Sequence, residues 1–435
     1  MPISPQNSHN GFKCKMNGLR FCMFTTFYPP FSFGGDAIGI QRLSRALVKQ
    51  GHSVTIILDA DAYNVLSPNP DPEIPESTDG VEIITLRSSY KRISILLTQQ
   101  IGRPVVQSKK IKQLLNDGQY DVIVYNNTSL VGGPGLLSYG NALKRYMAHE
   151  HWLICPSHVL WRHGRERCTS RQCIRCVLHY HRPPQLWRYT GLLQRQQKHV
   201  DTFIAMSEFS RKKHKEFGFK PDMKVLNYFL PEPDSSPATK ESSSPHNKPY
   251  FLFVGRLEKI KGLDDVIPVF KDFDQADLLI AGDGEYTDVL KDLAQDNPNV
   301  KFLGRVNPEE LDHYYQHAVA LIVPSVCFET FGIILIESFR QGTPVIARSI
   351  GPFPEIVQRS GGGILFNDAT DLTEAMKQIQ SNPEYRDKLA KQGRESFSQY
   401  WSEKAIVPEF LQIVKESAVN ANRQHIVKKL EAMKS

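Results

Sequence analysis

Short apolar runs alternate along the chain with longer segments whose apolar positions recur at helical spacing. An apolar run at 19–28 precedes a loop and a helical pattern over 38–52, and the next apolar run follows at 54–58. This order is typical of a βαβ unit. The alternation continues with strands expected at 81–86, 121–125 and 202–206 and helices expected at 108–116 and 207–217. It predicts a parallel sheet that helices cover on both faces.

A polar segment at 231–248, rich in Pro and Ser, interrupts the alternation and is typical of a linker. The alternation then begins again, with strands expected at 250–254, 277–281, 300–303, 320–324 and 344–347 and helices at 263–270, 311–317 and 332–341. The predicted fold class is therefore α/β, with two facing Rossmann-like, doubly wound parallel sheets. We expect a cleft where the carboxyl ends of the two sets of strands meet.

The chain of 435 residues is too long for one ordinary core, and its patterns divide it into five parts. We expect a leader at 1–18, a first Rossmann-like domain at 19–229 with an insert at about 155–199, a linker at 230–248, a second Rossmann-like domain at 249–399, and a helical tail at 400–435 that packs back on the first domain. No apolar run approaches the roughly 20 residues that span a bilayer, and the leader lacks the apolar stretch of a signal peptide. A cytoplasmic protein is therefore expected.

Charge and cysteine are distributed unevenly. Hydrophobic content of 40% and charged content of 23% are ordinary for a globular protein, and the formal net charge is +7. Between residues 161 and 199, however, eight Arg and one Lys accompany a single acidic residue. Four of the seven cysteines lie in or beside this segment: Cys155, Cys168, Cys173 and Cys176. A strongly basic insert therefore interrupts a nearly neutral body.

Two cations follow the first strand of the second half. Arg256 lies at the end of that strand and Lys261 at the start of the next helix, so both can reach a point just outside the sheet. An Arg fork and a Lys point charge together suit a diphosphate leaving group and would neutralise it without a metal ion. Two solvated cations at a helix start are the alternative that so short a pattern leaves open.

A second motif, from Glu329 to Gly332, stands directly before an apolar helix. The free N–H groups and the dipole of that helix would favour a phosphate, and Gly332 allows the backbone to approach it. Glu337 follows about two turns later, where its carboxylate could accept hydrogen bonds from ribose hydroxyls. A carboxylate that stabilises the helix dipole, together with a surface glutamate, is the alternative.

Together, these motifs resemble the retaining, GT-B-fold glycosyltransferases of the large family-4 class. The resemblance covers roughly residues 19–415 and rests on an ordered set of segments: FYPPFSFGG, RLSRALVKQGHSVTII, VGRLEKIKG, IAGDG, LGRV, ETFGIILIE, GTPVIA and GGGILF. It implies that the second domain binds a nucleotide-diphosphate sugar and that the first binds the acceptor. The expected reaction transfers a hexose-type sugar, with net retention, to a hydroxyl of a glycan, a lipid-linked glycan or a small molecule.

The resemblance also implies roles for matching positions. Arg256 and Lys261 contact the diphosphate, Glu329 contacts sugar hydroxyls near the reacting carbon, and Glu337 contacts the ribose. His149 lies in the cleft near the sugar, where its side chain or its backbone would support the charge of the transition state or orient the acceptor, so His149, Glu329, Arg256 and Lys261 form the expected catalytic set. The remaining expected donor contacts are Gly34, Gly35, Gly282, Arg305, Val306, Phe331 and Gly332.

The motif around His149 departs from the family pattern. Members of the class often show His-Asp-x-Trp, whereas Glu150 stands here in place of the Asp and His151 adds a second imidazole. A structural histidine is the alternative to a catalytic one. The expected acceptor contacts, which could equally cap a helix, are Asn126, Asn127 and Thr128.

No cofactor is expected for the chemistry, because the two cations serve the leaving group. Asp59 and Asp61 have the spacing of the metal site in the other major glycosyltransferase fold, but we predict that they lie in a strand-end loop. A structural Zn²⁺ is a separate hypothesis, since four thiolates could bind it. Its ligands would be Cys155, Cys168, Cys173 and Cys176, and free thiols in a reducing compartment are the alternative.

The Arg-rich insert leaves three partners open: anionic lipid, an acidic glycan or nucleic acid, of which nucleic acid is expected least. Its Trp and Tyr residues suit a membrane interface and could also stack on a sugar or a base. Peripheral contact with the inner face of the cytoplasmic membrane is therefore expected. Two other functions stay open as well: a nucleotide-sugar epimerase or phosphorylase on the same fold, and a non-catalytic nucleic-acid-binding or scaffold protein on a degenerate transferase body.

Overall fold

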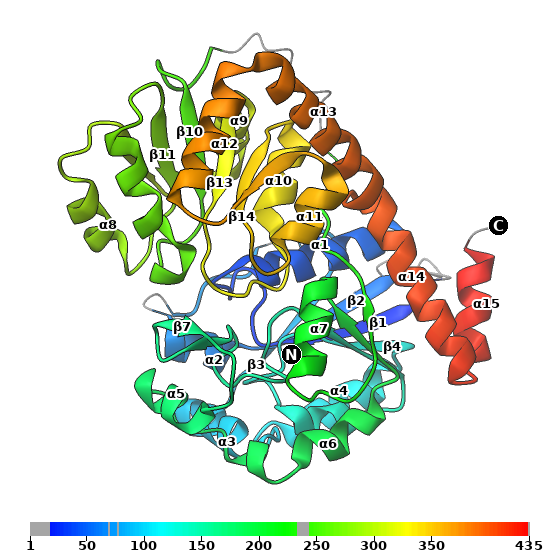
Figure 1. Ribbon diagram of the computed structural model, residues 1–435. Helices are drawn as coiled ribbons and strands as arrows, with labels where there is room; N and C mark the ends of the chain where they lie inside the picture. The colour runs from blue at the N-terminus through cyan, green and yellow to red at the C-terminus, as the bar shows by residue number, and fades with distance from the viewer. Residues whose placement is uncertain (1–17, 68–69, 76–77, 233–242, 434–435) are drawn as a thin grey trace, which may run out of the picture.

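Two parallel sheets build the two lobes of the protein (Figure 1). The computed structural model describes residues 18–67, 70–75, 78–232 and 243–433. The expected leader, except for Gly18, and residues 233–242 of the expected linker lie outside these ranges. The two-lobed α/β fold with facing parallel sheets confirms the predicted fold class.

The sheet of the first lobe has seven strands in the order β3-β2-β1-β4-β5-β8-β9. Its strands are β1 (Arg20–Thr25), β2 (Ser53–Asp59), β3 (Glu82–Leu86), β4 (Val122–Tyr125), β5 (Leu143–Ala148), β8 (Thr202–Ala205) and β9 (Met223–Val225). The central strand β1 is buried from Phe21 onward, as its apolar run predicts for a strand covered on both faces. The helices of this lobe are α1 (Gly35–Lys49), α2 (Ala60–Leu66), α3 (Lys91–Ile101), α4 (Ser108–Gly118), α5 (Cys173–His179), α6 (Leu192–Gln196) and α7 (Glu208–Glu216).

The sheet of the second lobe has six strands in the order β12-β11-β10-β13-β14-β15. Its strands are β10 (Tyr250–Val254), β11 (Asp277–Ala281), β12 (Val300–Gly304), β13 (Ala320–Val323), β14 (Val345–Arg348) and β15 (Gly363–Phe366). Its helices are α8 (Thr287–Ala294), α9 (Pro308–His317), α10 (Ile333–Gln341), α11 (Phe353–Ser360), α12 (Ala369–Ser381) and α13 (Pro383–Tyr400). In both sheets the chain order reverses beside the first strand, so a crevice opens at the carboxyl ends of the strands.

Two local predictions are wrong. The helix expected at 263–270 is replaced by two short 3-10 turns, Leu263–Asp265 and Ile267–Lys271, because Pro268 cannot donate the hydrogen bond that an α-helix needs there. The strand-end loop expected around Asp59 is the start of α2, whose first turn the Asp59 carboxylate caps by accepting from the Ala62 N–H at 3.2 Å.

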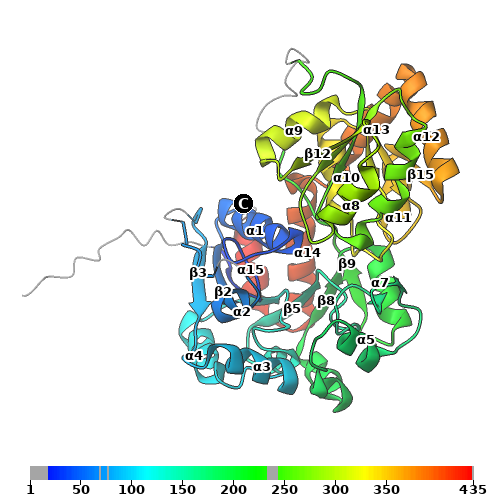
Figure 2. The same ribbon diagram turned by 90° about the vertical axis from the view of Figure 1, so that its left-hand side faces the viewer.

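The chain ends in two helices that lie against the first lobe, α14 (Glu403–Asn420) and α15 (Gln424–Ala432) (Figure 2). Phe410 of α14 packs against Phe21 of β1, with ring centroids 6.1 Å apart. Lys429 of α15 forms an ion pair with Asp121 at 2.8 Å. Within the described residues, no helix is long and apolar enough to cross a bilayer.

Candidate functional site

The amino-terminal ends of α1 and α10 meet across the cleft between the lobes. Gly34 precedes α1 and Gly332 precedes α10, and no side chain caps either helix. A Cβ atom built on Gly35 would lie 3.6 Å from Ile333 Cδ1, so the first turns of the two helices are close neighbours. Both helices therefore direct free N–H groups and the positive ends of their dipoles into one region, which is the arrangement that binds a phosphate group.

A partly buried ion pair stands beside these helix ends. Lys261 Nζ lies 2.7 Å from Glu329 Oε1, and the side chains are only 22% and 28% exposed. Burial favours the neutral form of Glu329, but Lys261 and a hydrogen bond from Ser325 outweigh it and hold the pKa of Glu329 below its usual value. Burial likewise opposes the charge of Lys261, and Glu329 raises the pKa of Lys261 in spite of it. Both groups are therefore charged at neutral pH.

Arg256 and Arg305 occupy the open edge of the same crevice. The Arg256 side chain is 61% exposed and pairs with Glu258 at 2.8 Å, so it can turn toward a ligand at little cost. Arg305 is 86% exposed, and its Nε lies 3.7 Å from an Asp283 carboxylate oxygen. Val306, the next residue, is partly buried.

Gly282 brings the ends of β10 and β11 close together. Its φ of 148° is rare for residues with side chains, and a Cβ atom there would lie 1.9 Å from the carbonyl oxygen of Gly255. Glycine is therefore required at this point of the sheet edge, beside the crevice in which the sequence predicts the base of a nucleotide.

Glu337 of α10 faces α1 of the other lobe. Arg42 Nη2 lies 3.6 Å from one carboxylate oxygen of Glu337, and the hydroxyl of Tyr315 donates to the other at 3.4 Å. Burial raises the pKa of Glu337, while Arg42 opposes the rise. Arg42 is a residue of the cleft that the sequence analysis missed. It stands seven residues after Gly35, and this helical spacing of two turns could have placed it on the same side of α1.

The loop that carries Glu329 joins the two lobes. The Thr330 hydroxyl donates to the backbone carbonyl of His149 at 2.8 Å, and the Ser207 hydroxyl donates to the carbonyl of Thr330 at 2.6 Å. Phe331, expected to contact the donor, is instead 2% exposed and packs on Tyr228 with ring centroids 5.8 Å apart. The backbone of this loop, rather than the Phe331 ring, therefore borders the cleft.

The imidazole of His149 is held inside the first lobe. Its Nδ1 lies 2.6 Å from the Tyr228 hydroxyl and its Nε2 lies 2.9 Å from Asn126 Oδ1, and only 6% of the residue is exposed. Burial lowers the pKa of His149 to about 3, so the ring is neutral at physiological pH. In this arrangement the backbone of His149, and not its ring, touches the loop that holds Glu329.

A cavity of about 820 Å³, called here the large cavity, opens beside these groups on the first lobe. It is bordered by Gly34 and Arg256 on the side of the helix ends, and by α3 and the insert on the far side. Asn127 lines it, as the predicted contact requires. Asn126 is occupied with His149, and Thr128 is fully buried, so neither reaches the cavity in this structure.

Two family models match consecutive parts of the chain. The model described as Glycosyltransferase Family 4 matches residues 33–227, and the model described as Glycosyl transferases group 1 matches residues 235–396. The chain belongs to the family-4 class of GT-B glycosyltransferases.

Individual relatives agree with this assignment. The chain is 40% identical over 119 residues to an uncharacterised glycosyltransferase of Methanocaldococcus jannaschii, a match that covers 26% of this chain and 30% of that protein. It is 24% identical over 399 residues to a glycogen synthase of Mycobacterium tuberculosis, covering 87% of this chain and 90% of that protein.

Solved structures show the same fold. Sucrose-phosphate synthase from Thermosynechococcus elongatus aligns with a TM-score of 0.71 at 20% identity, covering 92% of this chain and 98% of the other. Anabaena HepE in complex with UDP aligns with a TM-score of 0.65 at 17% identity, covering 92% of this chain and 100% of the other.

In this glycosyltransferase, the four cysteines of the insert are free thiols that lie close enough to act on one another's pKa: besides burial, Cys155, Cys173 and Cys176 all help to raise the pKa of Cys168. Cys155 Sγ lies 3.2 Å from the Ser157 hydroxyl, and Cys168 Sγ lies 3.4 Å from the Ser170 carbonyl oxygen. Burial raises the pKa of Cys168 to about 11 and raises the pKa values of Cys173 and Cys176 as well. Among residues 18–67, 70–75, 78–232 and 243–433, no group of three or more His, Cys, Asp or Glu side chains is arranged to hold a metal ion. The zinc hypothesis therefore gains no support from these side chains.

Half of the arginines of the insert serve the glycosyltransferase fold itself. Arg188 lies over the Trp187 ring at 4.4 Å and donates to the Trp152 carbonyl at 2.6 Å. Arg162 pairs with Glu166 at 2.8 Å, while Arg171 and Arg195 donate to backbone carbonyls. Arg165, Arg167, Arg175 and Arg182 have no ion pair or side-chain hydrogen bond with any described residue.

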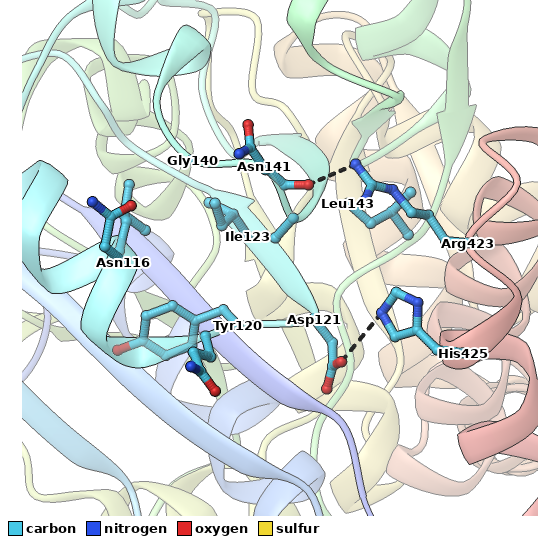
Figure 3. Close-up of a pocket in the computed structure, with 12 residues that line it drawn as sticks. Asn116, Tyr120, Asp121, Ile123, Gly140, Asn141, Leu143, Arg423 and His425 are labelled. Carbon is cyan, nitrogen blue, oxygen red and sulfur yellow. Dashed lines mark hydrogen bonds and ion pairs between the residues drawn. The ribbon is translucent and has the colours of Figure 1, made fainter.

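A second cavity, of about 240 Å³, lies at the opposite edge of the first sheet and does not belong to the glycosyltransferase site (Figure 3). Asp121, just before β4, faces His425 of the tail at 3.5 Å, and Arg423 donates to the Asn141 carbonyl at 2.6 Å. These residues stand at the amino ends of the strands, whereas ligands of such sheets bind at the carboxyl ends. The second cavity is therefore part of the junction between the tail and the first lobe.

Proposed function

We propose that this glycosyltransferase transfers a sugar, with retention, from a nucleotide-diphosphate sugar to a hydroxyl of an acceptor in the large cavity. The observation that carries the proposal is the convergence of the α1 and α10 helix ends on the Lys261–Glu329 pair. A diphosphate placed there meets backbone N–H groups from both lobes and the ammonium of Lys261. That HepE was solved in complex with UDP supports a nucleoside diphosphate in a fold of this kind.

The reaction we propose is a displacement on the front face of the sugar. The bond from the anomeric carbon to the diphosphate oxygen breaks, the acceptor oxygen forms the new bond to the same carbon, and the acceptor proton passes to the departing diphosphate. Lys261, with Arg256 turned inward, stabilises the negative charge on the diphosphate and needs no metal ion for this. Glu329 holds Lys261 in place and accepts hydrogen bonds from sugar hydroxyls.

The acceptor in this proposal is a glycan, a lipid-linked glycan or a small molecule. We also propose that the enzyme works in the cytoplasm, with peripheral contact at the inner face of the membrane. Four arginines of the insert support that contact, because they form no ion pair with any residue that the structure describes and can therefore meet anionic lipid: Arg165, Arg167, Arg175 and Arg182.

Thermal unfolding in the presence of UDP, GDP, ADP and their sugar derivatives tests the donor. We expect one nucleoside diphosphate to raise the melting temperature through mass action. Slow donor hydrolysis, followed by NMR, then tests the stereochemistry, because a retaining enzyme first releases the sugar with its original anomeric configuration. Absence of any nucleotide-dependent shift would contradict the proposal, and conversion of the sugar while it stays on the nucleotide would identify an epimerase instead.

A further inference from the structure

Most of the exposed large apolar side chains that the structure describes belong to the first lobe. Outside that lobe, the described residues include only Val289 and Leu293 of α8 and Val419 of α14 as exposed large apolar side chains. Those of the first lobe are Phe33, Leu66, Ile74, Tyr90, Ile93, Leu96, Ile101, Val105, Ile174, Leu178, Leu186 and Tyr189. Exposed apolar side chains that stand singly are ordinary, whereas those that lie beside one another around a cavity mark an interaction site.

Helix α3, its preceding residue Tyr90 and the insert carry most of these side chains. Ile93 and Leu96 of α3 are 59% and 50% exposed, and their spacing of three residues makes them neighbours on the helix surface. Leu178 at the end of α5 and Leu186 beyond it are 55% and 59% exposed. The Gln99 amide of α3 donates to the Pro183 carbonyl of the insert at 2.9 Å, and Leu96 of α3 and Val177 of α5 border the same large cavity. Residues 90–96 and 174–189 are therefore called here the α3–insert face.

Two arginines connect this face to the large cavity. Arg92 of α3 and Arg182 of the insert are exposed and line the cavity, and neither guanidinium has a partner among the described residues. Val177, Ile95 and Leu96 supply apolar wall between them. Of the acidic side chains that also line the cavity, Glu150 pairs with His158 at 2.6 Å, Asp36 begins α1, and Glu285 belongs to the second lobe. The side of the cavity next to the α3–insert face is therefore basic and apolar.

We propose that the α3–insert face docks on an anionic lipid bilayer and that the acceptor hydroxyl belongs to a lipid-anchored molecule whose head group enters the large cavity. This inference rests on the proposed function. Aliphatic side chains that enter the interface and arginines that meet anionic head groups act together in such docking. A soluble glycan would be bound by polar groups and aromatic rings, and it would gain nothing from aliphatic side chains placed outside the cavity.

Flotation of the full chain with lipid vesicles tests the inference. The probes are vesicles of phosphatidylcholine alone and of phosphatidylcholine with phosphatidylglycerol. The test variants are I93Q/L96Q, which keeps good helix formers on α3, and R92Q/R182Q. The matched control is V289Q/L293Q, which removes two exposed apolar side chains from a helix of the other lobe. Nucleotide-dependent thermal shifts of each variant report whether the donor site is intact.

We expect the wild-type chain and V289Q/L293Q to bind the anionic vesicles alike. I93Q/L96Q should bind about tenfold more weakly or worse, and R92Q/R182Q should lose affinity for anionic vesicles together with part of its salt dependence. Wild-type protein that does not float with anionic vesicles, or an α3 variant that floats like the control, would overturn the inference. If nucleotide-dependent thermal shifts persisted in either case, the proposed function would still hold. If the protein floated with anionic vesicles but showed no nucleotide-dependent thermal shift, the docking face would be supported and the donor site would be contradicted.

Discussion

The two sides of the cleft treat charge in opposite ways. On the second lobe, Lys261 is held by Glu329 at 2.7 Å, and the more exposed Arg256 pairs with Glu258 at 2.8 Å. On the far side of the large cavity, Arg92 and Arg182 have no ion-pair partner in the part of the chain that the structure describes, and exposed aliphatic side chains stand beside them in the sequence. A site whose charges are held in place before binding suits one constant ligand, the donor diphosphate. An open rim of basic and apolar side chains suits an acceptor that is presented at the surface of a lipid bilayer.

The sharpest test of the second-lobe side of the cleft is removal of its partly buried cation, Lys261. Lys261→Ala should lower the transfer or donor-hydrolysis rate by about 10²–10³-fold, because the leaving diphosphate loses its fixed positive charge. Lys259→Ala is the matched control, since Lys259 is exposed on the same 3-10 turn. Steady-state kinetics measure both variants. Equal losses in the two variants would show that the Lys261–Glu329 pair has no special place in the chemistry.

At the sheet edge of the second lobe, replacing Gly282 should destabilise the protein more than replacing the neighbouring Gly304. Gly282→Ala should lower the free energy of unfolding by about 2–3 kcal/mol, because its Cβ meets the Gly255 carbonyl. Gly304→Ala is the control: its φ is 69°, but a Cβ there has nothing within 4 Å, so a cost of about 1 kcal/mol is expected. Urea denaturation of both variants gives the comparison. The packing of the crevice edge would need revision if the two variants unfolded alike.

As the pH falls, the first lobe should lose stability before the second lobe does. Burial lowers the pKa of His149 and His151 to about 3 and the pKa of His52 and His214 to about 4, and all four belong to the first lobe. Their folded-state pKa values lie below the unfolded value of about 6.5, so the stability that they confer is complete above pH 6.5 and is lost as the pH falls toward 3–4. We expect a loss of several kcal/mol over this range.

Hydrogen exchange measured by mass spectrometry at stepped pH would follow each lobe separately. Amides of β4, β5 and β8 should lose protection at a higher pH than those of β10, β11 and β13. Simultaneous loss in both sheets would mean that the buried imidazoles do not decide acid stability.

The smallest effect on stability and binding is expected from the contact between the two lobes that Arg42 and Glu337 form. Arg42→Ala removes a guanidinium 3.6 Å from Glu337, and both side chains are about a quarter exposed, so the loss in stability should be about 0.2–1 kcal/mol. The Kd of the nucleoside diphosphate should fall about two- to fivefold, because the ribose no longer competes with Arg42 for Glu337. Arg45→Ala on the same helix, which breaks the pair with Asp79, should leave this Kd unchanged. Weaker nucleotide binding in Arg42→Ala would instead make Arg42 a donor contact.

The positions of Lys261, Glu329 and Gly332 on the second lobe could be predicted from the sequence, because these residues belong to short motifs that follow predicted strands. Lys261 and Glu329 meet because both follow parallel strands of one sheet, and Gly332 precedes its helix as expected. The far wall of the large cavity could not be predicted in this way. Arg92 and Arg182 are 90 residues apart in the chain, and only the packing of α3 on the insert brings them to one cavity.

Other failures of the sequence analysis have local physical causes. The strand β5 was missed because Lys144 and Arg145 interrupt its apolar run, and Arg145 is tolerated because it donates to the Ile413 carbonyl of the distant tail. The sequence could not show that Tyr228 binds the ring of His149 and leaves the backbone of His149 to meet the loop that carries Glu329, because no spacing rule connects Tyr228 with His149. Not all of the positive charge of the insert is available to a partner. Arg188 donates to the Trp152 carbonyl and Arg162 pairs with Glu166.

Calorimetric titration tests the central claim most directly, with the nucleoside diphosphate that gives the largest thermal shift as titrant. The account predicts that Lys259→Ala binds it with a Kd within about twofold of wild type and that Lys261→Ala binds at least about tenfold more weakly, because only Lys261 lies beside the helix ends of α1 and α10. Unchanged binding in Lys261→Ala, with its fold intact, would contradict the placement of the donor diphosphate at this site.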